Sequence, residues 1–131
     1  MDTFVGIDVA KAHLDLATRP TGPAGRQLHD EAGIAALVAQ LAAAPPTRIV
    51  LEATGGLEVP LVAALVAAGL PVAVVNPRQV RDFARAVGRL AKTDAIDAAV
   101  LAHFAEAVRP APRPLPDEQA RALAALLARR R

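Results

Sequence analysis

The residues best placed to do chemistry are four acids, which stand in two apolar strand-like runs and at the start of a predicted helix. Asp94 and Asp97 lie three residues apart at the predicted start of a helix, and residues with this spacing project from one helical face. Asp8 and Glu52 each stand at the end of an apolar, strand-like run. A carboxylate among strand residues is costly unless it is paired or binds a cation. Together, the four acids predict an oxygen-rich site for a hard divalent ion such as Mg²⁺.

Each acid also has a purely structural interpretation. Asp94 can cap the predicted helix, with Asp97 favoured by the helix dipole. Asp8 can cap a turn at the end of its strand, and Glu52 can mark the end of its strand. These interpretations explain the acids one at a time, whereas a shared site explains all of them, so we favour the site.

Arginine dominates the helix predicted to begin after Asn76-Pro77, where Asn is suited to the N-cap and Pro to the first helical position. Such a stripe is often only a solvated face, but arginine suits bidentate phosphate contact, which favours nucleic-acid binding. Gly88 is expected to interrupt the helix and leave the last two cations in a loop. The predicted stripe consists of Arg78, Arg81, Arg85, Arg89 and Lys92.

Two further features are candidates for phosphate binding. Thr54, Gly55 and Gly56 precede a predicted helix, where free backbone N–H groups could hold a phosphate, although a tight turn explains them equally well. Lys11, just after the Asp8 strand, either reaches a phosphate or is solvated. The remaining acids of interest are expected on exposed surfaces: Asp15, Glu58 and Glu106.

The composition describes a folded chain with a polar asymmetry. Of 131 residues, 53% are hydrophobic and 21% charged, which is typical of a globular domain. Aromatic residues make up only 2%, too few for a base-stacking platform, and the absence of cysteine excludes disulfides and thiolate metal sites. Residues 1–60 carry four basic and seven acidic side chains, whereas residues 76–131 carry eleven basic and six acidic ones. This asymmetry suggests a polyanion held beside a cation site.

The order of the predicted elements indicates an α/β fold. Three strands of an antiparallel meander precede βαβ units, giving a mixed five-stranded sheet with helices on both faces. No apolar run reaches the roughly 20 residues of a membrane span; we expect a cytoplasmic protein. The predicted strands are 3–9, 13–17, 26–30, 48–52 and 71–75, and the helices are 31–43, 56–68, one from 77, and one from 94 to about 108.

The domain organisation follows from the same patterns. We expect one domain over residues 1–108, a proline-rich linker over 109–116, and the start of a helical segment over 117–131. Because that last pattern stops without a cap, we expect the chain to continue into a further domain.

Four short blocks of the sequence, taken together, resemble the N-terminal domain of the DEDD transposases. These proteins are insertion-sequence recombinases whose nuclease domain is similar to the RuvC Holliday-junction resolvase. The blocks are Gly6–Lys11, Leu51–Gly56, Val75–Pro77 and Lys92–Ala98. The resemblance implies a ribonuclease-H-like fold in which a D-E-D-D tetrad binds Mg²⁺, with Mn²⁺ as a substitute. The tetrad residues are Asp8, Glu52, Asp94 and Asp97.

The resemblance also implies partners and a reaction. They are DNA, in some family members a structured guide RNA, and a homo-oligomer, either dimer or tetramer, acting at the bacterial nucleoid in DNA cleavage and strand exchange. Two metal ions roughly 4 Å apart would activate the attacking oxygen and stabilise the leaving one, with Lys92 near the scissile phosphate. The family's second domain supplies a nucleophilic serine, and this chain contains no serine. We therefore expect weak nuclease activity or none from the isolated chain.

Two alternatives remain open from the sequence. A non-catalytic nucleic-acid-binding or oligomerising module would use the acids only structurally. An actin-like or sugar-kinase ATPase also opens with Gly6-Ile7-Asp8, but its phosphate loop needs a glycine and a hydroxyl soon after the aspartate, and Val9-Ala10-Lys11 follow here.

Overall fold

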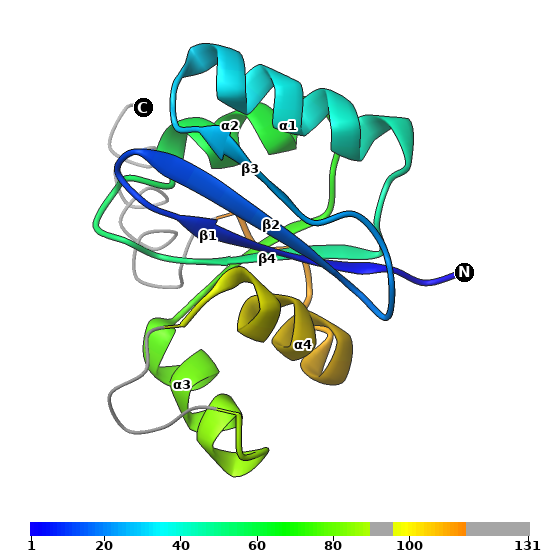
Figure 1. Cartoon of the computed structure of the whole chain (residues 1–131), viewed down its shortest axis with the longest axis vertical. Coiled ribbons are helices and arrows are strands. Elements are labelled where there is room, and N and C mark those ends of the chain that lie inside the picture. The colour runs from blue at the N-terminus through cyan, green and yellow to red at the C-terminus, as the bar shows by residue number, and fades with distance from the viewer. Residues whose placement is uncertain (90–95, 115–131) are drawn as a thin grey trace, which may run out of the picture.

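The computed structural model describes residues 1–89 and 96–114 (Figure 1). Within these residues, five strands and four helices follow one another in the predicted order. The strands are β1 (Phe4–Val9), β2 (His13–Arg19), β3 (Gly25–Leu28), β4 (Arg48–Glu52) and β5 (Val72–Val75). The helices are α1 (Glu31–Ala43), α2 (Val59–Ala67), α3 (Pro77–Ala86) and α4 (Ala98–Val108).

The strands form one mixed sheet in the order β3-β2-β1-β4-β5. Strands β1 to β3 pair antiparallel as a meander, and β4 pairs parallel with both β1 and β5. All four residues of β5 and the three central residues of β4 are buried, as expected of parallel strands covered on both faces. The predicted α/β fold with a mixed five-stranded sheet is confirmed.

Helices cover both faces of the sheet and create two cores. In Figure 1, α1 and α2 lie on one side of the sheet, and α3 and α4 lie on the other. Because side chains alternate along a strand, Ile7 packs in the core under α1 and α2, whereas Phe4 packs in the core under α3 and α4. In β4, Val50 belongs to the second core. The even-numbered residues of β1 and β4, which include Asp8 and Glu52, therefore face α4.

Helix α4 lies directly on β1 because Gly6 has no side chain. A Cβ at Gly6 would overlap the backbone of Ala98 and Ala102, and would stand only 2.7 Å from the Leu101 Cβ. No larger residue fits without moving the helix. Gly6 thus fixes how close the beginning of α4, with Asp97 as its N-cap, lies to the end of β1.

Helix α4 begins later than predicted. Asp97 has an extended backbone, and its side chain accepts the Val100 N–H at 2.9 Å, which makes Asp97 the N-cap and Ala98 the first helical residue. The expectation that Asp94 and Asp97 project from one helical face was wrong for Asp97, which precedes the helix. Asp94 and Lys92 lie outside the described residues.

Glycine decides two other helix boundaries, of which the first differs from the prediction and the second agrees with it. Helix α2 begins at Val59 rather than at residue 56, since Gly55 and Gly56 adopt positive φ angles of 70° and 106°. Helix α3 ends at Ala86, and Gly88 follows with a φ of 73°, as its position predicted. Asn76 caps α3 as expected by accepting the Arg78 N–H at 2.8 Å.

The beginning of the proline-rich stretch runs along the free edge of β5. The Arg113 N–H donates to the Val72 carbonyl at 2.8 Å, and the Val74 N–H donates to the Arg113 carbonyl at 2.7 Å. This pairing covers part of a sheet edge that would otherwise be open. The predicted segment 117–131 and the end of the 109–116 linker lie outside the described residues. No helix in residues 1–89 and 96–114 is both long and apolar enough to cross a membrane.

Candidate active site

Asp8 and Glu52 end two neighbouring parallel strands at the same level. Gly6 of β1 is opposite Val50 of β4, and the same register extended by two residues places Asp8 level with Glu52. Both side chains are half-buried and lie on the α4 side of the sheet. The structure therefore brings together two acids that are far apart in the sequence.

The charges of the two acids act on each other. Burial raises the pKa of Asp8, and the negative charges of Asp15 and Asp97 raise it further, while Arg26 lowers it. Burial also raises the pKa of Glu52; the charge of Asp8 adds to this effect and Arg81 opposes it. Both carboxylates are therefore held in surroundings that disfavour their ionised form.

One oxygen of Glu52 has no hydrogen-bond partner among the described residues. Its Oε2 atom is buried, and no described residue forms a hydrogen bond with it. Buried polar atoms are nearly always satisfied, so an orphaned carboxylate oxygen needs an explanation such as a missing ion. A cation between Asp8 and Glu52 would remove both the orphaned oxygen and the repulsion between the two carboxylates.

Asp97 lies on the same side of the sheet as this pair. It is exposed at the first turn of α4, and its charge contributes to the raised pKa of Asp8. The donor set is composed of carboxylate oxygens, which fits Mg²⁺ and Mn²⁺. Within residues 1–89 and 96–114, however, no three acidic or histidine side chains are close enough to hold a metal ion. Asp94, the fourth predicted ligand, is outside that part of the chain.

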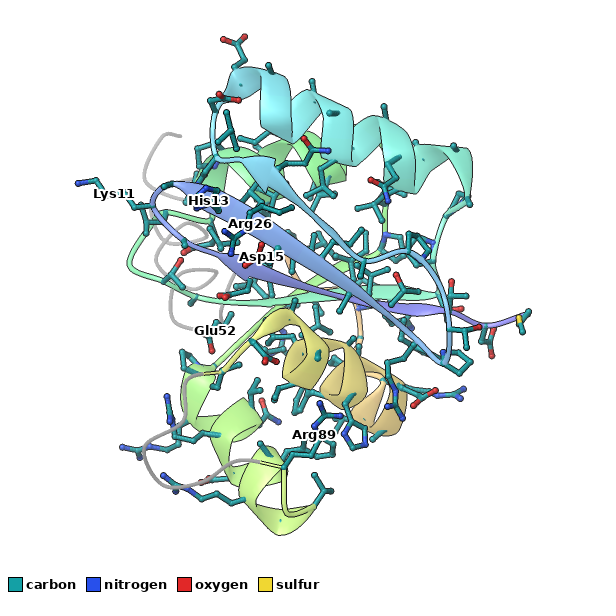
Figure 2. The ribbon with its side chains drawn as sticks, viewed as in Figure 1. Lys11, His13, Asp15, Arg26, Glu52 and Arg89 are labelled. Atoms are coloured by element: carbon teal, nitrogen blue, oxygen red, sulfur yellow. The ribbon has the colours of Figure 1, made fainter. Side chains whose placement is uncertain are left out.

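The predicted basic stripe divides into two parts. Arg78 and Arg85 are exposed on α3, Arg81 is half-buried there, and Arg85 makes an ion pair of 3.8 Å with Asp82. Arg89 follows the end of α3, as expected from the interruption of the helix at Gly88. Its Nη1 atom lies 3.4 Å from His103 Nδ1 on α4. Figure 2 shows Arg89 beside that helix.

The predicted phosphate site at Thr54, Gly55 and Gly56 is occupied by the chain itself. Oε1 of Glu58 accepts the Thr54 N–H at 2.7 Å, the Thr54 hydroxyl at 3.1 Å and the Gly56 N–H at 3.2 Å. The prediction that these N–H groups are free was therefore wrong for Thr54 and Gly56. Glu58 is also only 2% exposed, which contradicts its expected place on the surface.

An ion pair that the sequence interpretation missed lies beside Asp8. Asp15 of β2 is the cross-strand partner of Asp8, and Arg26 of β3 is the partner of Asp15. The Arg26 Nε donates to Asp15 Oδ1 at 2.7 Å, and its Nη2 donates to Oδ2 at 3.1 Å. The hairpin register was the only sequence signal for this contact, and it depends on the exact length of the connecting loop.

Lys11 is solvent-exposed, whereas Glu106, also expected on the surface, forms an ion pair. Lys11 is exposed in the β1–β2 turn, and Figure 2 shows its side chain extending away from the sheet. Glu106 of α4 is not simply solvated, because its Oε1 atom makes an ion pair of 2.8 Å with Arg19.

Comparison with solved structures identifies the fold. A Thermus thermophilus RuvC structure is 19% identical with a TM-score of 0.54, covering 84% of this chain and 98% of that one. T. thermophilus RuvC in complex with a Holliday junction substrate is 16% identical with a TM-score of 0.59, covering 86% and 99%. These similarities show the ribonuclease-H-like fold that the resemblance implied.

Comparison of sequences identifies the family. Curated proteins give no significant match. Residues 5–131, nearly the whole chain, match the DEDD transposase family named after IS110 and described as "Transposase". The match agrees with the resemblance drawn from the four sequence blocks and leaves the ATPase alternative without support. The chain belongs to the IS110-type DEDD transposase family.

Proposed function

We propose that this chain is the metal-dependent catalytic domain of a transposase that cleaves and exchanges DNA strands. The observation that carries the proposal is the pairing of Asp8 with Glu52, two half-buried carboxylates at adjacent strand ends; Oε2 of Glu52 has no hydrogen-bond partner in the part of the chain that the structure describes. Two neighbouring carboxylates whose ionised forms are disfavoured by burial and by each other's charge cost stability, so their presence favours a functional role.

The roles of the chain's residues follow from their positions. Asp8, Glu52 and Asp97 from the described part of the chain, together with Asp94, are the proposed ligands of Mg²⁺, for which Mn²⁺ can substitute. When bound, the metal would supply Lewis-acid stabilisation of the oxygens at a phosphodiester. Arg81, whose charge acts on Glu52, would lie beside the substrate, and the exposed Arg78 and Arg85 would contact the DNA backbone. Lys92 is a further proposed phosphate contact.

The substrate and assembly are also proposals. One RuvC neighbour is in complex with a Holliday junction substrate, which supports branched DNA as the substrate of this chain. Guidance by a structured RNA, action as a dimer or tetramer, and a cytoplasmic location at the nucleoid are consistent with the family and extend the same proposal.

The direct test compares acids inside and outside the site. In the complete transposase, Asp8→Asn and Glu52→Gln should each reduce recombination by at least about 1,000-fold, equivalent to about 4 kcal/mol of transition-state stabilisation. Asp82→Asn, which removes an exposed acid of α3 paired with Arg85, is the matched control and should retain activity. Wild-type activity in Asp8→Asn or Glu52→Gln would refute the catalytic proposal.

A binding module without chemistry is the second candidate. It is favoured by the exposed arginines of α3 and by the lack of a three-ligand metal cluster within the described residues. In that case DNA affinity would survive Asp8→Asn, would fall with Arg81→Ala and Arg85→Ala, and no metal-dependent cleavage would be found in any variant.

A further inference from the structure

Arg26 is held beside the acidic pair with part of its hydrogen-bonding capacity unused. Its Nε and Nη2 atoms bind the two oxygens of Asp15, and no other described residue accepts a hydrogen bond from it. A guanidinium has five N–H groups, so Nη1 and one hydrogen of Nη2 remain available. The Arg26 side chain is 61% exposed, which leaves these groups accessible.

The position of this ion pair is defined by the sheet register. Asp8, Asp15 and Arg26 are consecutive cross-strand partners on β1, β2 and β3, and Glu52 lies level with Asp8 on the other side. The four residues form a row across the sheet: Glu52, Asp8, Asp15 and Arg26. In Figure 2, Asp15 and Arg26 lie together on the β2–β3 side, with Lys11 and His13 at the adjoining turn.

Stability does not explain why this pair is present. Exposed ion pairs contribute little to folding, and Asp15 stands directly opposite another acid, Asp8, which is an unfavourable cross-strand arrangement. The pair does, however, hold an arginine next to the acids. The positive charge of Arg26 offsets part of the rise in the pKa of Asp8, and the charge of Arg81 does the same for Glu52. Each acid of the pair is therefore influenced by one arginine.

We propose that Arg26 is a phosphate-contacting residue for the nucleic-acid strand that crosses the acidic site, and that Asp15 is the residue that positions it. The ligand is the sugar–phosphate backbone, which Arg26 would contact from the β2–β3 side while α3 contacts it from the other. Arginine suits this role because its remaining N–H groups form a planar fork that matches two phosphate oxygens. The inference rests on the proposed function, since it places the substrate across Asp8 and Glu52.

The matched control is a second arginine–carboxylate pair, between Arg19 of β2 and Glu106 of α4. Arg19 at the far end of β2 binds Glu106 at 2.8 Å, and its side chain is 38% exposed. Arg19 is paired in register with Phe4, at the beginning of β1, whereas the acids stand at its end. Arg19→Ala therefore removes the same charge and the same kind of ion pair away from the site.

The experiment measures DNA binding, which is independent of cleavage. Fluorescence anisotropy with a labelled four-way DNA junction, in Ca²⁺ and over a range of salt concentrations, would compare wild type, Arg26→Ala, Arg26→Lys and Arg19→Ala. We expect Arg26→Ala to weaken binding about tenfold and to reduce the salt-dependence slope by about one, as for the loss of one phosphate contact. Arg26→Lys should restore the slope but only part of the affinity, and Arg19→Ala should resemble wild type.

A double-mutant cycle tests the role of Asp15. If Asp15 positions the fork, Arg26→Lys should weaken binding when Asp15 is present and have little further effect in the Asp15→Asn background. An effect of equal size in both backgrounds would overturn the positioning role, because a merely structural Asp15 would not distinguish arginine from lysine.

The outcomes separate this inference from the proposed function. An unchanged slope in Arg26→Ala, or an equal loss in Arg19→Ala, overturns the phosphate contact while leaving the acids' catalytic role standing. Full recombination activity in Asp8→Asn, with binding still dependent on Arg26, refutes the proposed catalysis and supports the contact. If the wild-type protein does not bind DNA, both fall.

Discussion

Glu52 and Glu58 flank the same turn, but their carboxylates are treated in opposite ways. Glu58 is only 2% exposed, and its Oε1 atom accepts three hydrogen bonds from Thr54 and Gly56. Burial raises the pKa of Glu58, but these hydrogen bonds outweigh burial and leave the pKa lowered. Glu52 is less buried, yet its pKa is raised and its Oε2 atom has no partner among the described residues.

Burial alone therefore does not distinguish a structural acid from a candidate site acid. The buried Glu58 holds the turn before α2 together, and its charge stabilises the fold because Thr54 and Gly56 donate hydrogen bonds to it. Glu52 lies beside another acid, and its Oε2 atom has no hydrogen-bond donor among the described residues, so burial and the charge of Asp8 disfavour its ionised form. The partners of a carboxylate are therefore the better guide to its role.

The largest expected effect on stability is at Glu58. Glu58→Ala should lower the free energy of unfolding by about 1–3 kcal/mol, because it removes a buried side chain and the three part-buried hydrogen bonds that hold the turn. Urea denaturation at pH 7 measures this change. Glu31→Ala, which removes an exposed acid from the first turn of α1, should cost only about 0.5 kcal/mol. A similar small loss at Glu58 would contradict the structural role given to it.

The next effect tests how the acidic site is assembled. Gly6→Ala should destabilise the fold by about 1–3 kcal/mol, because the new Cβ would collide with the backbone of α4. Gly25→Ala is the control, since no atom lies within 4 Å of a Cβ added there. Thermal unfolding of both variants gives the comparison, and equal melting temperatures would show that α4 does not depend on close approach at Gly6.

Divalent metal bound at Glu52 should stabilise the protein. At concentrations ten to a hundred times the dissociation constant, Mg²⁺ or Mn²⁺ should add about 1.4–2.7 kcal/mol, because it binds only the folded state. Differential scanning fluorimetry with and without metal would show a higher melting temperature in the wild type and no change in Glu52→Gln. Metal-induced stabilisation of equal size in both proteins would place the ion elsewhere.

The smallest effect is electrostatic and depends on pH. Because the pKa of Glu52 is raised in the folded state, its ionisation costs stability as the pH rises through that pKa. Without divalent metal, Glu52→Gln should therefore be more stable than wild type by about 0.5 kcal/mol at pH 7, an amount typical of like charges on adjacent strands. The difference should shrink on acidification and vanish near about pH 3, below the ordinary glutamate pKa of about 4.3, where the Glu52 side chain is protonated in both states. Denaturation curves at pH 3 and 7 provide the measurement.

Glu58 has the opposite sign in the same experiment. Its lowered pKa means that its contribution to stability is present at neutral pH and is lost as the pH falls through the folded-state pKa. The stability difference between wild type and Glu58→Ala should therefore shrink on acidification. A gap that stays constant down to low pH would separate the role of Glu58 from its charge.

Much of the fold could be predicted from local patterns, whereas the start of α4 could not. Alternating residues in β2, apolar runs in β4 and β5, and the Asn76-Pro77 cap gave the elements and their order. The predicted start of α4 was wrong because Asp94 and Asp97 are equally good caps by sequence, and only the packing of Ala98 on Gly6 explains where the helix begins.

The candidate site also combines features that local sequence predicts with features that depend on tertiary packing. The sequence by itself determined that Asp8 and Glu52 end apolar strands and that arginines follow β5, because residue type and periodicity are local properties. Only the tertiary structure decided that Asp8 lies level with Glu52, that Glu58 occupies the glycine turn, and that Arg26 lies beside Asp15. The reason is physical: these contacts depend on strand register and on competition for hydrogen-bond donors, which are settled only when distant segments pack together.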